Sequence, residues 1–246
     1  MQKKRLLKFI DKYSLSGTIN AVVWKFDGKD LSTLCTSQDN LLVAKVSMSD
    51  YKNDKIELGI DTTDQLDKLL RIMGDDLDLS ILTKTGGVPV SLQIRDERKT
   101  TVNYSLSDIA VIPPRPKSIN VPDFDVEIPI TPEFVSMFVN ATRALSGEDF
   151  FTVASDGKET NIVIGYGKNA NSHRITLDVN TSIASKLTPI SFTAKHLREA
   201  LLANKEVTGG MIKISQKGMC YLSFDQTDDD GTYTSEYYLI FVDLSK

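Results

Sequence analysis

Residues 126–147 read Val126-Glu-Ile-Pro-Ile-Thr-Pro-Glu-Phe-Val-Ser-Met-Phe-Val-Asn-Ala-Thr-Arg-Ala-Leu-Ser-Gly147, and they join a strand-like segment to an amphipathic helix. Thr131 suits the N-cap, Pro132 the first helical position and Glu133 the first turn. The apolar residues then recur every three or four positions, which is the helical period, until Gly147. The stretch therefore predicts a strand at 126–130 and a helix at 131–146.

The same arrangement recurs along the chain. Amphipathic helices are predicted to begin near Gln2, Thr62, Thr131 and Thr193, which are 60, 69 and 62 residues apart. Three strand-like segments with alternating apolar residues follow each helix. At the second helix, Thr62 followed by Gln65 has the pattern of a capping box. The first helix differs because no strand-like segment precedes it. Few short helices among many strands predict an α+β fold with antiparallel sheets.

The longest interval contains the proline-rich run Ile112-Pro-Pro-Arg-Pro116, so the four units divide into two pairs. A chain of 246 residues has room for two domains. We therefore predict an N-terminal domain at 1–108, a connector at 109–124 and a C-terminal domain at 125–246.

Several classes of protein are disfavoured by the sequence. No apolar run approaches the roughly 20 residues that span a bilayer, and Lys8 and Asp11 interrupt the apolar residues of the N-terminal segment. The two cysteines, Cys35 and Cys220, lie in strand-like segments and give no disulfide framework, which favours a soluble protein of a reducing compartment. We find no nucleophile elbow, no metal-ligand spacing and no dinucleotide motif. The sequence thus predicts no catalytic residues, metal or cofactor.

The charge of the chain is unevenly distributed. The four predicted helices hold 11 of the 29 basic residues and 5 of the 33 acidic ones, which gives them a net charge of +6. The rest of the chain then carries −10. Solvated helix faces often carry Lys and Arg, so a single basic helix would mean little. Four such helices on one face would form a surface suited to phosphates without base-specific contacts.

Three stretches carry a resemblance to a known family. They are Pro189-Ile-Ser-Phe-Thr-Ala-Lys-His-Leu-Arg-Glu-Ala-Leu-Leu202, Gly210-Met-Ile-Lys-Ile-Ser-Gln-Lys-Gly-Met219 and Tyr237-Tyr-Leu-Ile240. With the two pairs of units, they resemble the DNA sliding clamps. The length is similar to that of the two-domain clamps that close as trimers, the proliferating cell nuclear antigen type and the T-even-phage type. The phage type is the closer resemblance, and it implies a viral protein in the host cytoplasm.

The resemblance implies a homotrimeric ring around duplex DNA, with helices lining the hole and strands outside. Such a processivity factor is not an enzyme; it tethers the replicative DNA polymerase and is opened by a clamp-loader ATPase. The residues expected to face phosphates are Lys3, Lys4, Arg5, Lys8, Lys12, Lys68, Arg71, Arg143, Lys195, Arg198 and Lys205.

The resemblance also implies two protein-binding regions. Subunits are expected to join through the strands at 100–106 and 174–179, with Thr100, Val102, Tyr104, Arg174, Ile175 and Leu177 at the contact. Partner peptides are expected at the connector, where the apolar residues are Val111, Ile112, Ile119 and Val121. These four residues are equally well explained as anchors that fix the connector to the sheet.

Two other functions stay open on the sequence. One is a non-enzymatic viral structural or adaptor protein built from repeated α+β units, without DNA encirclement. The other is an enzyme whose site has no recognisable motif, for which no residue argues.

Overall fold

A computed structural model describes residues 1–246 except 52–53, 168–171, 182, 208, 230 and 245–246. The chain forms two compact units. Unit 1 contains Met1–Thr36, Ala44–Pro116 and Gln226–Thr234, and unit 2 contains Ser37–Val43, Lys117–Asp225 and Ser235–Lys246. Each unit thus includes a short segment from the other half of the sequence.

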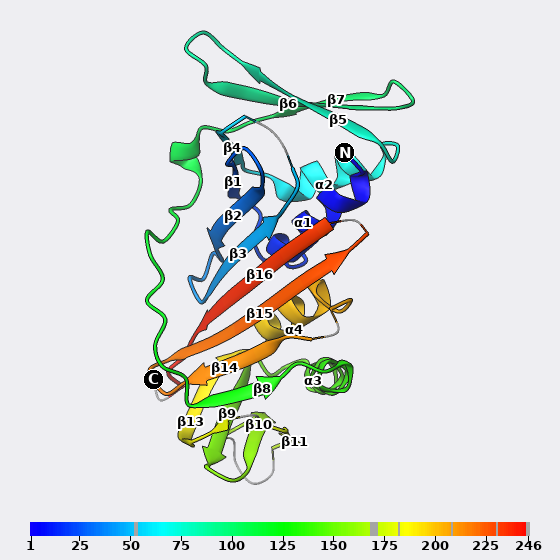
Figure 1. Cartoon of the computed structure of the whole chain (residues 1–246). Helices are drawn as coiled ribbons and strands as arrows, with labels where there is room; N and C mark the ends of the chain where they lie inside the picture. The colour runs from blue at the N-terminus through cyan, green and yellow to red at the C-terminus, as the bar shows by residue number, and fades with distance from the viewer. Residues whose placement is uncertain (52–53, 168–171, 182, 208, 230, 245–246) are drawn as a thin grey trace. The chain divides into compact units, whose positions relative to one another are not determined.

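Unit 1 combines α-helices and the short 3-10 helix η1 (Ile109–Val111) with two groups of strands, as can be followed in Figure 1. The helices, α1 (Lys3–Ser14) and α2 (Thr63–Arg71), contact each other. One group of strands follows the order β3-β2-β1-β4, and the other is a separate antiparallel sheet, β5-β6-β7. The bounds are β1 Val22–Phe26, β2 Leu31–Thr36, β3 Leu42–Met48, β4 Ile56–Ile60, β5 Leu77–Thr83, β6 Pro89–Asp96 and β7 Thr101–Ser105.

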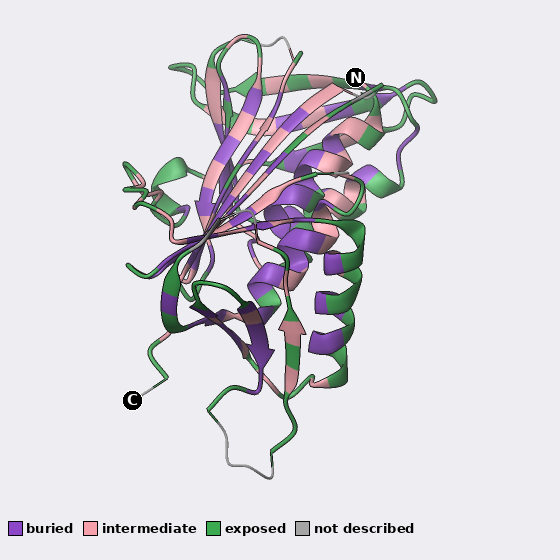
Figure 2. Cartoon of the chain, turned by 60° about the horizontal axis from the view of Figure 1, so that its bottom comes forward, coloured by how far each residue is buried: buried purple, intermediate pink, exposed green. Residues whose placement is uncertain are grey.

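The core of unit 1 lies between its two helices and strands β1 to β4. Phe9 and Tyr13 of α1 pack edge to face at 5.3 Å, and Phe9 meets Trp24 of β1 at 5.8 Å. The Trp24 indole also donates a hydrogen bond to the Tyr13 hydroxyl at 3.2 Å. Buried aromatic residues with their polar atoms paired fix the helix on the sheet. The other residues of the helices are half-buried or exposed, and the colours in Figure 2 alternate along the helices accordingly.

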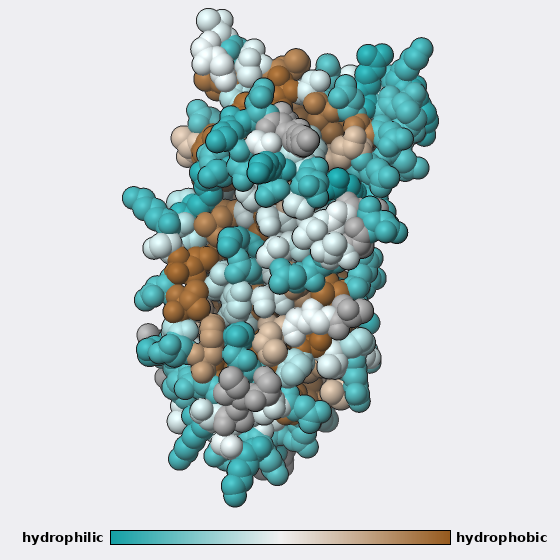
Figure 3. Space-filling model, in the orientation of Figure 1, coloured by the Kyte–Doolittle hydropathy of each residue, from teal (hydrophilic) through white to brown (hydrophobic). Residues whose placement is uncertain are grey.

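The β5-β6-β7 sheet is less completely covered. Leu92 and Ile94 of β6 are buried, whereas Leu82, Val88 and Val90 around the β5–β6 turn are exposed. Apolar atoms interrupt the mainly hydrophilic surface over this sheet in Figure 3. This end of unit 1 therefore leaves apolar side chains in water.

Unit 2 has the same kinds of elements. Helices α3 (Pro132–Ala144) and α4 (Ala194–Ala203) contact each other. One group of strands follows the order β12-β8-β14-β15-β16, of which the end of β15 and the start of β16 are counted in unit 1, and a second sheet has the order β11-β10-β9-β13. The bounds are β8 Val126–Pro129, β9 Phe150–Asp156, β10 Thr160–Ile164, β11 Ile175–Asp178, β12 Ile183–Ala184, β13 Lys186–Thr193, β14 Met211–Ser215, β15 Met219–Asp228 and β16 Gly231–Ile240.

An aromatic row forms the core between α3 and the second sheet. Phe134 and Phe138 of α3 stack at 6.1 Å, Phe138 meets Phe151 of β9 at 5.4 Å, and Phe151 meets Phe192 of β13 at 5.6 Å. Phe138, Phe151 and Phe192 have no exposed surface. Burial of this row stabilises the packing of α3 on the sheet.

The capping predictions had different outcomes. Thr131 caps α3 as predicted, since its hydroxyl accepts a hydrogen bond from Phe134 N at 3.1 Å, and Pro132 begins the helix. The capping box at Thr62 is wrong, because the Thr62 side chain makes no cap hydrogen bond. Its hydroxyl instead lies 3.0 Å from that of Tyr104 and 3.1 Å from Asp61. A hydrogen bond with Tyr104, which is distant in the sequence, replaces the predicted cap hydrogen bond of Thr62.

The start of α1 explains the missing strand of the first unit. Gln2 forms an isolated antiparallel bridge with Asp76, and the Lys3 amide donates to Asp75 O at 2.7 Å. This short pairing takes the place of the strand that precedes the other helices. Within the described ranges, no helix combines the length and apolarity needed to cross a membrane.

Candidate nucleic-acid and partner interfaces

The basic residues of α1 lie mostly against the protein. The Lys3 ammonium donates to Met73 O at 2.8 Å, and the Arg5 guanidinium donates to Ser49 O at 2.7 Å. Lys8 and Lys12 lie over the ring of Tyr233 at 5.3 and 5.9 Å, and Lys12 is only 2% exposed. Lys4 is exposed. The sequence could not reveal the contacts of Lys8 and Lys12, because Tyr233 lies in β16, more than 200 residues away along the chain.

The cations of the other helices are more accessible. Lys68 and Arg71 of α2, Arg143 of α3 and Lys195 of α4 are exposed, and so is Lys205, which follows α4. Arg71 pairs with Asp67 at 2.7 Å, which neutralises part of its charge. Arg198 is half-buried and bonds Glu199 at 2.9 Å. The exposed subset therefore consists of Lys4, Lys68, Arg71, Arg143, Lys195 and Lys205.

Strand β7, one of the two expected subunit contacts, is the last strand of its sheet. Its side chains alternate, with Val102 half-buried, Tyr104 buried and their neighbours exposed. Burial raises the pKa of the Tyr104 hydroxyl, and hydrogen bonds with Thr62 oppose the shift. Thr100, just before the strand, is exposed. Tyr104 thus anchors the strand within unit 1.

Strand β11, the other expected contact, is also the last strand of its sheet. Ile175 and Leu177 are half-buried, and Arg174 is exposed just before the strand. Each of the two predicted segments therefore ends a sheet.

The alternation of backbone hydrogen bonds along β7 and β11 shows which of their backbone groups face away from the sheet. Leu106 N donates to Val90 O, and Asp96 N donates to Thr100 O, so the even-numbered residues of β7 bond to β6. Val179 N donates to Thr160 O, so the odd-numbered residues of β11 bond to β10. The outward amides and carbonyls accordingly belong to residues 101, 103 and 105 of β7 and to residues 176 and 178 of β11.

The connector is fixed at one end and exposed at several positions. Ile112 is buried next to Gly59, and Arg115 forms two bonds to the Glu57 carboxylate at 3.1 and 3.2 Å. Val111, in contrast, is 71% exposed. In unit 2, Val121 is 48% exposed and Ile119 is half-buried. Ile112 therefore serves as an anchor, whereas Val111 and Val121 present apolar surface to solvent.

Unit 2 contains a cavity of about 820 Å³ that the sequence did not predict. It is lined by the α3–β9 loop, the start of the segment after β10, part of β13, the β14–β15 turn and residues 241–244. Tyr166, Phe241 and Leu244 line it while remaining exposed. Its volume is in the range of ligand and peptide pockets. No sequence motif could reveal it, because five separate segments form its walls.

Two partly buried polar clusters occur elsewhere in unit 2. His196 of α4 pairs with Asp39 at 3.2 Å; burial lowers the pKa of His196, and Asp39 opposes the shift. The hydroxyls of Tyr221 and Tyr238 both donate to Glu236, at 2.9 and 3.1 Å. Burial and Glu236 raise the pKa of Tyr221 to about 12.

Nothing in the described part of the chain has the composition of a metal centre: no group of three or more His, Cys, Asp or Glu residues is placed to hold an ion. Burial raises the pKa of the Cys35 thiol to about 12 and also raises that of Cys220, which keeps both thiols protonated and unreactive.

Comparison with known proteins identifies the fold. No protein-family model matches the sequence, and no curated protein matches it. Among solved structures, the proliferating cellular nuclear antigen of Entamoeba histolytica matches with a TM-score of 0.72 and 16% sequence identity, over 98% of this chain and 96% of that one. The prediction of an α+β clamp fold is confirmed. The chain therefore has the sliding-clamp fold of proliferating cell nuclear antigen.

Proposed function

We propose that the chain is a DNA sliding clamp, a non-enzymatic ring of three copies that encircles duplex DNA and tethers a replicative polymerase. The carrying observation is the fold, which matches a clamp along nearly the whole chain. A polymerase, a clamp-loader ATPase and sequence-independent duplex DNA are the partners that this role requires. A viral source and a place in the host cytoplasm remain part of the proposal.

The edge strands β7 and β11 support the proposed ring. An unpaired strand edge is an aggregation hazard unless it is covered, and β7 and β11 each leave a row of outward backbone groups. If β7 of one copy pairs with β11 of the next, both edges are satisfied. Head-to-tail contacts of this kind form a ring when the rotation between neighbouring copies closes after a full turn. The proposed contact includes Thr100, Val102, Arg174, Ile175 and Leu177, with buried Tyr104 anchoring β7 behind it, and the hydrogen bonds would be made by the alternate residues.

The proposed phosphate contacts fall on the exposed cations. Lys4, Lys68, Arg71, Arg143, Lys195 and Lys205 are accessible. Lys3, Arg5, Lys8, Lys12 and Arg198 are held by neighbouring groups and would add to the field of the surface rather than touch DNA. Mobile lysines favour sliding, because they attract phosphates without fixing a register.

For partner peptides we propose the connector, with exposed Val111 and its buried neighbour Ile112 in unit 1, and exposed Val121 and half-buried Ile119 in unit 2. The 820 Å³ cavity of unit 2 is a second candidate, because exposed Tyr166, Phe241 and Leu244 line it.

Encirclement can be tested without a loader on linear duplex DNA that carries biotin at both ends. A clamp threads over a free end, so protein added before streptavidin should be retained, and protein added after streptavidin should not. Without streptavidin it should slide off. Equal retention in all three arms would show ordinary binding and reject encirclement.

Two further measurements accompany this test. Sedimentation should give a trimer of three 27.3 kDa chains, and a stable monomer would favour the adaptor alternative. The triple variant Lys68→Glu, Arg143→Glu and Lys195→Glu should lose retention. The control variant Lys25→Glu, Lys84→Glu and Lys186→Glu makes the same charge change at exposed positions outside the helices and should keep it.

The subunit contact has its own test. Asn103→Pro removes an outward amide, which an edge strand tolerates, so the variant should fold as a monomer. Val102→Pro removes an amide that bonds to β6 and should instead disrupt the sheet. A trimer that survives Asn103→Pro would rule out pairing through β7.

A further inference from the structure

We propose that Asp96 is a positioning residue for the subunit contact: its buried carboxylate ties the end of α2 to the β6–β7 turn and thereby fixes which backbone groups of β7 face outward. The proposal rests on the proposed trimer, and it concerns residues of unit 1 alone.

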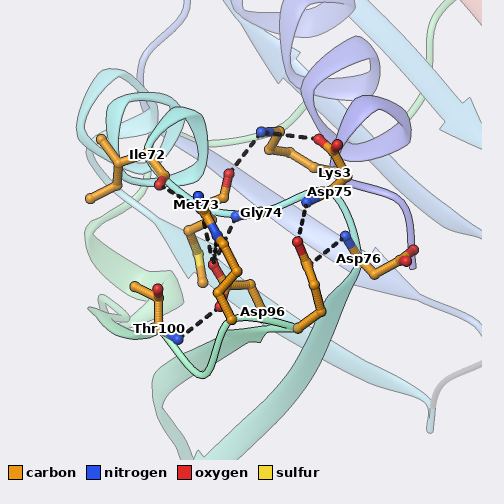
Figure 4. A network of polar contacts seen from close by, with 10 residues as sticks. Lys3, Ile72, Met73, Gly74, Asp75, Asp76, Asp96 and Thr100 are labelled. Carbon is orange, nitrogen blue, oxygen red and sulfur yellow. Dashed lines mark hydrogen bonds and ion pairs between the residues drawn. The ribbon is translucent and has the colours of Figure 1, made fainter.

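The segment after α2 is held by side chains rather than by regular structure (Figure 4). Its carbonyls accept from cations: Arg98 donates to Ile72 O at 3.1 Å, and Lys3 donates to Met73 O at 2.8 Å. A helix C-terminus favours positive charge, so these two groups also complement the dipole of α2. Lys3 thus has a structural role that differs from the phosphate contact expected of it.

The amides of the same segment donate to two carboxylates. Gly74 N donates to Asp96 at 2.8 Å, while the next two amides, Asp75 N and Asp76 N, donate to Glu97 at 3.2 and 3.0 Å. Gly74 leaves the room that this requires, because a Cβ there would lie 2.1 Å from a Glu97 oxygen. Side chains of the β6–β7 turn therefore satisfy three consecutive amides.

Asp96 is the centre of this network. Its side chain is fully buried and accepts from Gly74 N, from Thr100 N at 2.7 Å and from the Arg98 guanidinium at 3.2 and 3.3 Å. Burial alone would raise the pKa of the Asp96 carboxyl, but these donors outweigh it and lower the pKa to about 2. The group is ionised and fully paired, which makes a buried charge tolerable.

The same carboxylate controls the turn into β7. Asp96 and Thr100 form the last hydrogen-bonded pair of the ladder, Lys99 N donates to Asp96 O at 3.0 Å, and Lys99 adopts a left-handed conformation at φ 66°. Because Asp96 also holds Thr100 N, it fixes the residue at which β7 begins. A slip of one residue would exchange the inward and outward groups of β7. The residues available to a neighbouring subunit therefore depend on this turn.

The test compares four variants with the wild-type chain. Asp96→Asn keeps the shape but replaces one acceptor oxygen with a donor. Arg98→Ala removes part of the network from an exposed position, so it should fold even if Asp96→Asn does not. Asp78→Asn removes a charge from an exposed residue of the same sheet. Val46→Ala weakens the buried core of unit 1 away from the turn.

Amide hydrogen exchange and sedimentation equilibrium are measured on each full chain. For Asp96→Asn we expect at least tenfold faster exchange at Gly74 and Thr100 and at least tenfold weaker self-association. Arg98→Ala should change the exchange rate and the self-association in the same direction but by less, and Asp78→Asn should change neither quantity. Val46→Ala should lower stability without weakening association.

The outcomes separate the two proposals. A wild-type trimer that Asp96→Asn leaves intact, or that Val46→Ala weakens equally, overturns the positioning role and leaves the clamp proposal standing. A wild-type monomer at all concentrations overturns the trimer, and the positioning role with it. Faster exchange with selectively weaker association of Asp96→Asn and Arg98→Ala supports the inference.

Discussion

The two separate sheets, β5-β6-β7 in unit 1 and β11-β10-β9-β13 in unit 2, each end in a candidate subunit edge, but they are held in different ways. In unit 2, Phe138 of α3, Phe151 and Phe192 form a continuous aromatic core. In unit 1, the turn into the edge strand is held by the ionised Asp96 and its donors. The unit 2 sheet therefore relies on apolar packing at β9 and β13, whereas the turn into β7 relies on hydrogen bonds that fix a register.

The comparison predicts the largest effect in the aromatic core. Phe151→Ala should lower the free energy of unfolding by about 3–5 kcal/mol, because it leaves a cavity among fully buried rings. Leu82→Ala in the unit 1 sheet should cost below about 1 kcal/mol, since Leu82 is exposed. Denaturant titration measures both, and similar losses would contradict the contrast.

The second-largest effect is expected from acid, which should weaken the Asp96 network at the turn into β7. The folded pKa of Asp96 is about 2, below the usual value of an aspartate, so its stabilising effect is present above about pH 4 and is lost as the pH falls toward 2. Unfolding titrations between pH 5 and 2 should show a steeper loss for wild type than for Asp96→Asn. Parallel curves would show that the carboxylate contributes no acid-sensitive stability.

Helix caps provide a smaller contrast within unit 2. Thr131→Ala should cost about 1 kcal/mol, because the hydroxyl accepts from Phe134 N. Thr193 precedes α4 but makes no cap hydrogen bond, and its buried hydroxyl has no partner in the described part of the chain. Thr193→Val should therefore be neutral or slightly stabilising. Thermal unfolding of the two variants checks the difference, and equal losses would contradict it.

The smallest expected effect concerns His196. Its folded pKa is lowered mainly by burial, so the unfolded chain takes up a proton more readily as the pH falls through about 6.5. Stability should be fully present above that pH and decline below it, and His196→Gln should remove this slope. The matched control is His173→Gln at an exposed site, which should keep it. If the pH dependence of stability persists in His196→Gln, other groups cause it.

Much of the fold could be predicted because its signals are local. The Thr131-Pro132-Glu133 start of α3 and the alternating residues of β2 and β3 report their own periods. Thr62 shows the limit of such signals: its sequence fits a capping box, but Tyr104, far along the chain, takes its hydroxyl. The cavity of unit 2 escaped prediction for the same reason, since its walls come from five segments.

By itself, the sequence determined the repeated helix-and-strand units, the α+β class and the accumulation of positive charge on the helices, because these depend on residue type and spacing. Only the tertiary structure decided which charges are available. Lys3 caps α2, Lys12 is buried beside Tyr233, and Lys68 and Lys195 stay exposed. The tertiary structure also decided which backbone groups of β7 face outward, because the hydrogen bonds at Asp96 and Thr100 set the pairing of β7 with β6. A side chain's environment is set by neighbours distant in sequence, and no local pattern contains them.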